Sequence, residues 1–416
     1  MKNKIIILLI SLLCATAKAQ RSEIFVSTIA SLQIIPNNNW LEPLPVVNLA
    51  STDNQIVIAF DELSHDYHRY TYTVQHCEAD WTPSEELLES DYVDGFASGN
   101  TIDDYEQSTN TNTLYTHYKL TLPNDRCRLK LSGNYTVTIY DEDNDNMPVL
   151  KACFMVTEQS MKSSMTQTTN TDIDINNSHQ QVSINLNYNS INVTSPATQI
   201  KTVVLQNGRW DNCVNNPKPQ YVKADGMMWD HNRDLIFTAG NEYHKFETLD
   251  PSHTTMGLER VGWDGKQYHA WIFTDEPRPH YLYDEDADGA FCIRNSDNVN
   301  INTESEYILT HFTLKAPRQD GKVYLNGAWT HDCFNQRFEM SWNENDGLYE
   351  AVVPLKQGYY NYQYLLMRQD GTLSPLPSDG SFYQTKNSYQ LLVYFRGQND
   401  RTDRLVNYLN LSSLLP

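Results

Sequence analysis

The chain has 416 residues, a formal net charge of −21 at pH 7 and 11% aromatic residues. At roughly 150 residues per domain, this length predicts two or three domains. The negative charge would repel phosphate backbones, which excludes nucleic acid as a first choice of partner. With 40% hydrophobic and 20% charged residues, the composition is that of a folded globular protein and not of a disordered one.

Residues 1–19 differ from the rest of the chain. Lys2 and Lys4 precede an apolar stretch at residues 5–13, and Ala17-Lys18-Ala19 forms a small-residue cleavage site before Gln20. This order is typical of a secretory signal peptide and predicts export to the periplasm. No later stretch approaches the roughly 18 apolar residues of a membrane-spanning helix. Cleavage would remove three lysines and leave a net charge of −24, from 28 Lys and Arg against 52 Asp and Glu.

Strand patterns dominate the chain beyond residue 20. Short β-branched or aromatic stretches with period-two alternation are separated by Asn, Asp, Gly and Ser, which is typical of strands joined by turns. The predicted strands lie at residues 55–60, 70–75, 134–140, 182–187, 202–205, 308–314, 349–353 and 389–394. Because helix-period patterns are scarce, the sequence predicts an all-β fold of tandem Ig-like or early-set antiparallel β-sandwich domains.

Two polar stretches, at residues 158–179 and 295–306, suggest domain boundaries. We therefore expect an N-terminal β-sandwich at 20–158, a middle β-rich domain at 159–302 and a C-terminal β-sandwich at 303–397. The tail at 398–416 alternates Leu with polar residues as a short amphipathic helix does, and no role is assigned to it.

Seven cysteines occur at irregular spacing, which is no disulfide framework. Cys77, Cys127 and Cys153 all fall in the first third of the exported chain. A bridge between Cys77 and Cys153 and a set of buried free thiols both remain open.

Three carboxylates at alternate positions, Asp284, Asp286 and Asp288, precede Gly289. Such a pattern opens a calcium loop, because calcium prefers hard oxygen ligands around a tight turn. The alternative is a turn between strands at 279–283 and 290–293. The closing Glu of an EF-hand is absent, since Asn295 stands at that position. Calcium is thus the one candidate cofactor, and none is otherwise expected. The acidic stretch at 141–145 also has Asp at alternate positions, and we expect a solvated loop there.

Catalytic patterns are missing. His65 and His68 have no partner at ligand or triad spacing in the sequence, and no Ser is flanked by Gly on both sides as in a nucleophile elbow. The sequence therefore predicts a protein that is not an enzyme.

The last predicted domain carries a more specific pattern. Residues 322–329, 338–340, 347–353 and 355–365 resemble the early-set, Ig-like fold of glycogen-binding and isoamylase N-terminal domains. Sugar-binding members use exposed aromatic platforms, and Trp329 is the candidate contact for a glycan or a partner here. A second Trp of the usual motif is absent, so the pattern favours the fold more than glycan binding, and a core position for these aromatics is the alternative.

Further motifs run through the whole chain in order, among them His76-Cys-Glu-Ala-Asp-Trp81, Asp91-Tyr-Val-Asp-Gly-Phe96, Ser132-Gly-Asn-Tyr135, Arg209-Trp-Asp211 and Leu392-Val-Tyr-Phe-Arg396. Together they resemble the type IX secretion system plug proteins of Bacteroidetes, from about residue 25 to residue 396. The family favours Asn where Asp288 stands, which weakens the calcium hypothesis.

The resemblance implies a periplasmic protein, associated with the outer membrane, that docks on the large β-barrel translocon of this system. Its function would be to seal the periplasmic opening of the barrel and so gate secretion. The sequence does not indicate which residues contact the translocon. The alternative function is a periplasmic or surface glycan-binding protein that uses the C-terminal domain.

Overall fold

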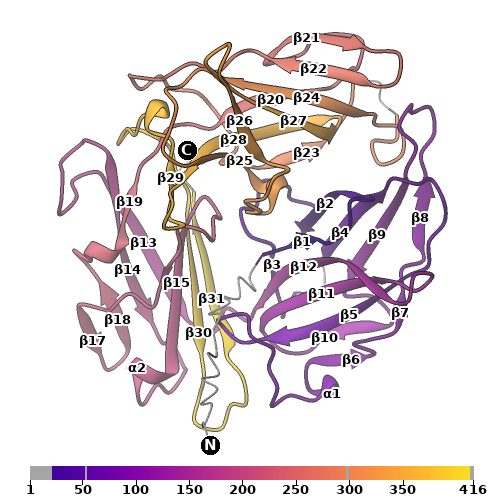
Figure 1. The fold of residues 1–416 in the computed structure, drawn as a ribbon. Coiled ribbons are helices and arrows are strands. Elements are labelled where there is room, and N and C mark those ends of the chain that lie inside the picture. Colours follow the sequence, from indigo (N-terminus) through magenta and orange to yellow (C-terminus); the bar gives the residue numbers. More distant parts are fainter. Residues whose placement is uncertain (1–20, 52–53, 297–298, 413–416) are drawn as a thin grey trace, which may run out of the picture.

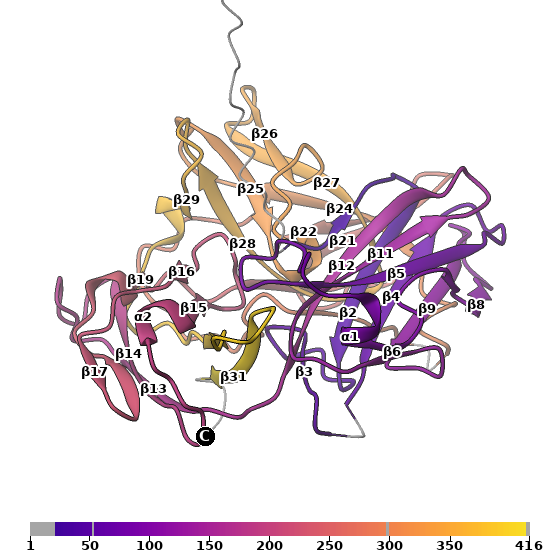
Figure 2. The same ribbon diagram turned by 90° about the horizontal axis from the view of Figure 1, so that it is seen from below.

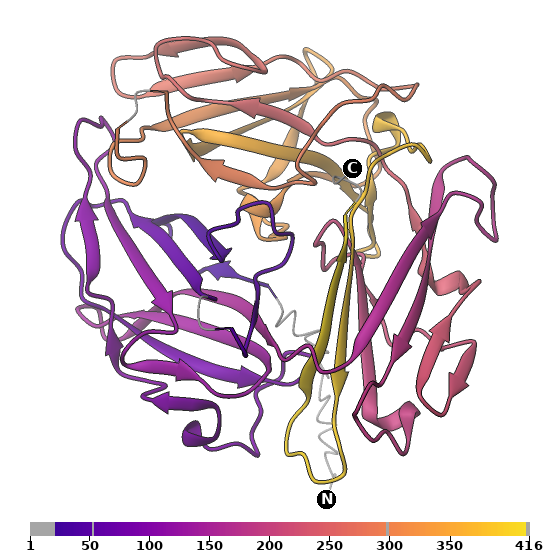
Figure 3. The same cartoon turned by 180° about the vertical axis from the view of Figure 1, so that it is seen from behind.

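The computed structural model describes residues 21–51, 54–296 and 299–412 and is almost entirely β-sheet. Three β units surround a central hairpin, as Figure 1 shows from the front and Figure 3 from behind. The α-helices among the described residues, α1 (Glu89–Tyr92) and α2 (Pro196–Gln199), are single turns. In this part of the chain no helix is long and apolar enough to cross a membrane. The all-β sandwich prediction is confirmed, and each of the eight strands predicted from period-two alternation coincides with an observed one.

The N-terminal unit (residues 21–158) is a sandwich. One sheet has the order β1-β12-β11-β5-β7, with β3 beside β12, the other has the order β2-β4-β9-β8, and β6 pairs with β10. The strands are β1 (Glu23–Ile24), β2 (Ile29–Pro36), β3 (Val46–Asn48), β4 (Ile56–Glu62), β5 (Tyr70–Cys77), β6 (Val93–Gly95), β7 (Asn100–Thr101), β8 (Asp104–Gln107), β9 (Thr116–Leu122), β10 (Cys127–Leu129), β11 (Gly133–Asp141) and β12 (Met147–Thr157).

Period-two alternation explains the core of this unit. Successive side chains of a strand point to opposite faces, so Tyr135, Val137 and Ile139 of β11 are all buried on one face. They belong to the same apolar cluster as Phe60 and Tyr118 of the opposite sheet, whose rings stack at 5.4 Å between centroids.

The middle unit (residues 159–240 and 388–412) is assembled from two distant parts of the chain. Its sheets have the orders β13-β14-β18-β17, with β19 beside β14, and β16-β15-β30-β31. The elements are β13 (Lys162–Thr168), β14 (His179–Asn187), β15 (Ile200–Gln206), β16 (Val214–Asn215), β17 (Tyr221–Lys223), β18 (Gly226–Trp229), η1 (Arg233–Leu235), β19 (Ile236–Thr238), β30 (Tyr389–Phe395) and β31 (Arg404–Leu411). Its core combines Val182 and Ile184 with Leu391 and Val393.

The C-terminal unit (residues 241–387) contains a sheet of order β20-β28-β25-β26-β27-β24-β22-β21, with β23 and β29 beside β28. The elements are β20 (His244–Glu247), β21 (Leu258–Trp263), β22 (Tyr268–Ile272), β23 (Phe291–Ile293), β24 (Tyr307–Leu314), β25 (Lys322–Asn326), η2 (Ala328–Thr330), β26 (Glu339–Asn343), β27 (Leu348–Lys356), β28 (Gly358–Met367), β29 (Leu373–Pro375) and η3 (Pro377–Asp379). One core cluster joins strands from both ends of this order, including Phe246, Phe312 and Tyr362.

Strand pairing groups the chain differently from the predicted boundaries after residues 302 and 397. Strands β20, β22 and β23 precede residue 302 but pair with β28 or β24, which lie beyond it. The polar stretch at 295–306 is therefore a connection inside the C-terminal unit. Residues 404–411 of the tail form strand β31, which pairs antiparallel with β30, and not a helix. The C-terminal unit is thus inserted between β19 and β30 of the middle unit.

The C-terminal hairpin, β30 and β31 with their loop at 396–403, lies between the middle and N-terminal units (Figures 1 and 2). Leu392 of β30 is fully buried in a cluster with residues of the N-terminal unit. We expect Leu392→Ala to lower the free energy of unfolding by about 2–5 kcal/mol, because the cavity it leaves forfeits apolar contacts. Guanidinium denaturation measures this loss.

The matched control is Val352→Ala, since Val352 is 49% exposed on β27. A surface truncation of this kind should change stability by less than about 0.5 kcal/mol. An equal effect of the two substitutions would show that the hairpin does not belong to the shared core.

Candidate functional site

The three aspartates of the predicted calcium loop have different roles. Asp284 is exposed and forms an ion pair with Lys245 at 2.6 Å. Asp286 accepts hydrogen bonds from the backbone N–H groups of Tyr243 and Asp288, so it holds the turn together. Within the described residues, the three carboxylates do not bring their oxygen atoms to within 4.8 Å of one another as a set. Strand β23 comes after the turn as predicted, but residues 279–283 form no strand.

Burial has a strong effect on this turn. Desolvation and the neighbouring Asp286 raise the pKa of Asp288 to about 8. Desolvation likewise raises the pKa of Asp286 to about 6. Burial and the closeness of the two carboxyl groups therefore both oppose ionisation in this turn.

Trp329 lies in the core of the C-terminal unit. Its side chain is 7% exposed, and its indole Nε1 donates a hydrogen bond to the backbone oxygen of Asn361 at 2.8 Å. The rings of Phe312, Phe338 and Tyr360 surround it at 5.6–6.1 Å. The ring therefore has no free face at the surface for a sugar or a partner.

The described cysteines form no disulfide bond with one another. Cys77 on β5 and Cys153 on β12 lie on opposite sides of β11. Neighbouring strands are about 4.8 Å apart, so these two residues lie farther apart than the roughly 7 Å that a disulfide tolerates between Cα atoms. A bridge between them is therefore incompatible with this sheet. The predicted signal peptide, residues 1–19, lies outside the described residues.

The feature that dominates the structure is the set of contacts between units, and the first of these is the C-terminal hairpin. A shared apolar cluster joins the hairpin and β15 to the N-terminal unit. Its buried members are Leu44, Val46, Trp81, Cys153 and Met155 of the N-terminal unit and Val203, Leu205, Leu392, Tyr394 and Leu405 of the middle unit. The hydroxyl of Tyr394 also donates a hydrogen bond to Asn134 Oδ1 at 2.8 Å.

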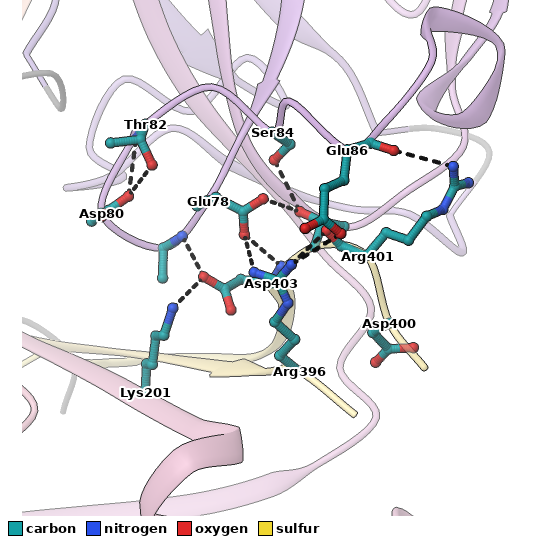
Figure 4. Close-up of polar contacts among 12 residues, drawn as sticks. Glu78, Asp80, Thr82, Ser84, Glu86, Lys201, Arg396, Asp400, Arg401 and Asp403 are labelled. Carbon is teal, nitrogen blue, oxygen red and sulfur yellow. Dashed lines mark hydrogen bonds and ion pairs between the residues drawn. The ribbon is translucent and has the colours of Figure 1, made fainter. Parts of the chain in front are cut away.

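Polar contacts fix the tip of the hairpin against the loop at 78–86 (Figure 4). Asp403, with a side chain only 1% exposed, accepts hydrogen bonds from the backbone N–H of Ala79 at 3.0 Å and from Lys201 Nζ at 2.7 Å. Glu78 accepts in turn from the Thr402 hydroxyl at 3.0 Å and from the Asp403 backbone N–H at 2.9 Å. Hydrogen bonds to charged groups are stronger than neutral ones, so this tip is firmly anchored.

Ion pairs at the rim of this contact are more exposed. Arg396 lies 3.6 Å from Glu86, and Arg401 lies 2.8 Å from Asp91. Exposed pairs of this kind contribute only about 0–1 kcal/mol each. They orient the hairpin tip, while the buried Asp403 and the apolar cluster stabilise it.

The second contact joins the N-terminal and C-terminal units through a buried ion pair. Asp61 of β4 lies 2.7 Å from Lys356 Nζ of β27, with both side chains at most 2% exposed. His117 Nδ1 and the Tyr307 hydroxyl also contact the Asp61 carboxylate, at 2.6 and 2.7 Å. Burial opposes ionisation of Asp61, but the charges of Lys356 and His117 outweigh it and lower the Asp61 pKa. The ammonium group of Lys356 further lies 4.1 Å from the centroid of the Tyr115 ring.

The third contact comes from the two chain segments that connect the middle and C-terminal units. The side-chain amide of Gln180 donates to the backbone oxygens of Tyr383 and Thr385, at 2.9 and 2.8 Å. His244, just after the outgoing connection, forms ion pairs with Asp275 at 2.9 Å and with Asp379 at 3.1 Å. The two connections are thereby held together where they enter the C-terminal unit.

A partly open pocket of about 200 Å³ lies where the units meet. Trp40 and Trp81 of the N-terminal unit, Trp210 of the middle unit and Tyr243 of the C-terminal unit line it. Beside it Arg209 forms a two-pronged hydrogen bond with Asp211, at 3.0 and 2.6 Å. Contacts join all three pairs of units, so the three units form one continuous body.

The comparisons with known proteins agree with this arrangement. The family model described as type 9 secretion system plug protein 1st domain matches residues 29–158, which lie in the N-terminal unit. A crystal structure described as a hypothetical protein from Parabacteroides merdae ATCC 43184 is 39% identical to this chain, with a TM-score of 0.90. The match covers 94% of this chain and 98% of that one. No curated protein matches the chain.

The chain belongs to the type 9 secretion system plug protein family. Its role therefore lies in that secretion system. The 94% coverage shows that this plug protein shares all three units, and not the first alone, with a solved structure.

The residues that join the units of the plug protein match no local sequence motif. Asp61 and Lys356 are 295 positions apart, and each resembles any other charged residue in a strand. One signal is available in the sequence. Asp61 and Lys356 interrupt strand-like stretches, and burial of a charged side chain there is costly unless an opposite charge pairs with it.

The position of His244 predicts a pH dependence of stability. Burial opposes protonation of its ring, but Asp275 and Asp379 outweigh burial and raise the pKa of His244 from 6.5 to about 9. A raised pKa in the folded state favours the folded protein below pH 6.5, and this contribution is lost as the pH rises through 9. We expect a loss of about 3 kcal/mol over this window, measured by denaturant titrations at a series of pH values.

The variant His244→Gln should make this slope shallower, and the raised pKa of Asp288 accounts for the part that stays. His253→Gln is the control, because His253 pairs with Asp250 but is 79% exposed in its side chain. An unchanged slope between pH 6.5 and 9 in His244→Gln would contradict the assignment.

Proposed function

We propose that this plug protein is exported to the periplasm, docks on the outer-membrane translocon barrel of the type 9 secretion system and seals its periplasmic opening. Membership of the plug family supports the association with the system. Sealing needs no catalysis, only a body that covers the opening and binds reversibly. A net charge of −24 on the exported chain keeps such a body soluble between binding events.

The observation that carries the proposal is the mutual bracing of the three units. A seal fails if its parts move independently, and relative motion is the default for domains joined by small polar interfaces. Here the hairpin anchors the middle unit to the N-terminal unit, and the buried pair of Asp61 and Lys356 anchors the C-terminal unit to the N-terminal unit. Three sandwiches joined in this way behave as one rigid cover.

Glycan binding, the alternative function that the sequence suggests, loses its main support. Its candidate platform, Trp329, is a buried core residue that hydrogen-bonds to the backbone of Asn361. We therefore carry only the plug function forward.

Docking predicts a specific partner. The tagged full-length protein, expressed from its own gene and cross-linked in intact cells, should co-purify with a very large outer-membrane barrel identified by mass spectrometry. A tagged, exported protein of unrelated sequence serves as the control. Recovery of the plug protein without any large barrel under these conditions would contradict the proposal.

The matched variants refine this test. Lys356→Met leaves the Asp61 carboxylate buried without its counter-ion, which should loosen the contact between the N-terminal and C-terminal units. Lys315→Ala removes a lysine of an exposed pair with Glu276. We expect weaker barrel recovery for Lys356→Met and unchanged recovery for Lys315→Ala. Circular dichroism of both variants checks that they are folded.

A further inference from the structure

A cluster of possible metal ligands lies at one end of the N-terminal unit, away from the contacts between units. It consists of His68, Asp141 and Asp143, each of which offers one ligand atom within 4.8 Å of the others. None of the three takes part in the contacts between units described above. We propose that these three side chains bind one divalent cation of the zinc class. Sequence patterns do not indicate this site, because His68 has no partner at ligand spacing along the chain and the acidic stretch at 141–145 is typical of a solvated loop.

Antiparallel pairing brings the ligands together. Asp141, the last residue of β11, pairs with Tyr70, the first residue of β5. His68 precedes Tyr70 by two positions, and Asp143 comes two positions after Asp141. Both approach the end of the same strand pair, so the register of the sheet fixes which side chains meet. His68 Nδ1 then lies 3.3 Å from Asp141 Oδ2.

The ligands are held in place before any ion binds. The Tyr118 hydroxyl accepts a hydrogen bond from the backbone N–H of His68 at 2.8 Å and donates to its backbone oxygen at 3.0 Å. The His68 ring stacks on Tyr70 at 5.9 Å between centroids. Asp143 Oδ2 accepts from the backbone N–H of Arg69 at 2.9 Å, and Asp141 Oδ1 accepts from that of Asp143 at 3.1 Å. Such preorganisation lowers the entropic cost of binding.

The charges around the cluster favour a cation. Among the described residues, no Lys or Arg side chain forms an ion pair with Asp141 or Asp143, and the nearby Arg69 pairs with Glu142 instead at 2.9 Å. The side chain of Asp141 is only 9% exposed. Within the described ranges, Asp141 contacts only His68 as a nitrogen-bearing side chain, and a divalent ion between the two carboxylates would offset their mutual repulsion.

The ligand atoms select the kind of ion. One imidazole nitrogen and two carboxylate oxygens suit Zn²⁺, whereas Ca²⁺ prefers six to eight oxygen ligands. His68 is 30% exposed and Asp143 is exposed, so water can complete the coordination. The loop of Asp284, Asp286 and Asp288 lacks a nitrogen ligand, and Asp284 there already has a cation partner in Lys245.

Calorimetric titration of the chelator-treated mature protein with Zn²⁺ tests the proposal. We expect saturation at one Zn²⁺ per chain and a melting temperature that rises with Zn²⁺ concentration, because an ion that binds the folded state stabilises it. Ca²⁺ at the same concentrations should give neither effect. Absence of a saturable Zn²⁺ site, or equal binding of Ca²⁺, would overturn the assignment.

Variants locate the ion. Asp143→Asn should weaken Zn²⁺ binding by at least about tenfold, since it removes one of three charged or nitrogen ligands. The matched control is Asp145→Asn, because Asp145 lies in the same loop but outside the cluster. Asn also tolerates the left-handed backbone conformation of Asp145, whose φ is 54°. Equal weakening by both substitutions would indicate diffuse attraction to an acidic loop and contradict the site. Melting curves without metal show whether the variants fold.

Discussion

The C-terminal hairpin is the element on which the rest of the structure depends. The sheet that contains β15 and β16 gains its other strands, β30 and β31, from residues 389–411, so the middle unit is incomplete without these residues. The same hairpin supplies Leu392, Tyr394 and Leu405 to the apolar cluster against the N-terminal unit. One pair of strands thus completes one unit and joins it to another.

Insertion of the C-terminal unit between β19 and β30 results from this arrangement. Both of its ends leave the middle unit, and a second tether ties it to the N-terminal unit through Lys356 and Asp61. Each of the three units is therefore held by the other two. Breaking a buried ion pair by removing one partner costs about 3–5 kcal/mol, so these contacts resist the motions that a seal must avoid.

Sequence patterns are sufficient for what depends on neighbouring residues. Period-two alternation predicts β5 and β11, whose buried positions alternate along the strand. Strands β4 and β30 are buried at every position, and their apolar and aromatic stretches between turn residues predict them. Pairing partners cannot be predicted in this way. The Leu and polar alternation near the C-terminus fits a strand, but only the open edge of β30 provides a partner for it.

The surroundings of the candidate site residues escape prediction for a related reason. The spacing of Asp284, Asp286 and Asp288 is that of a calcium loop, but Asp286 uses its oxygens to accept backbone N–H groups within the turn. Trp329 matches a surface motif and packs in the core because Phe312 and Phe338 close over it. Motif spacing specifies which groups are near in sequence and does not specify what surrounds them.

A rigid three-unit body is proposed to seal the barrel by covering it. The most direct measurement is the ionic conductance of the purified translocon barrel in a planar lipid bilayer, recorded as the protein is added to the periplasmic side. We expect large open-channel currents to fall to the level of the bare bilayer at saturating protein. Currents that persist while the protein is bound to the barrel would contradict a sealing function.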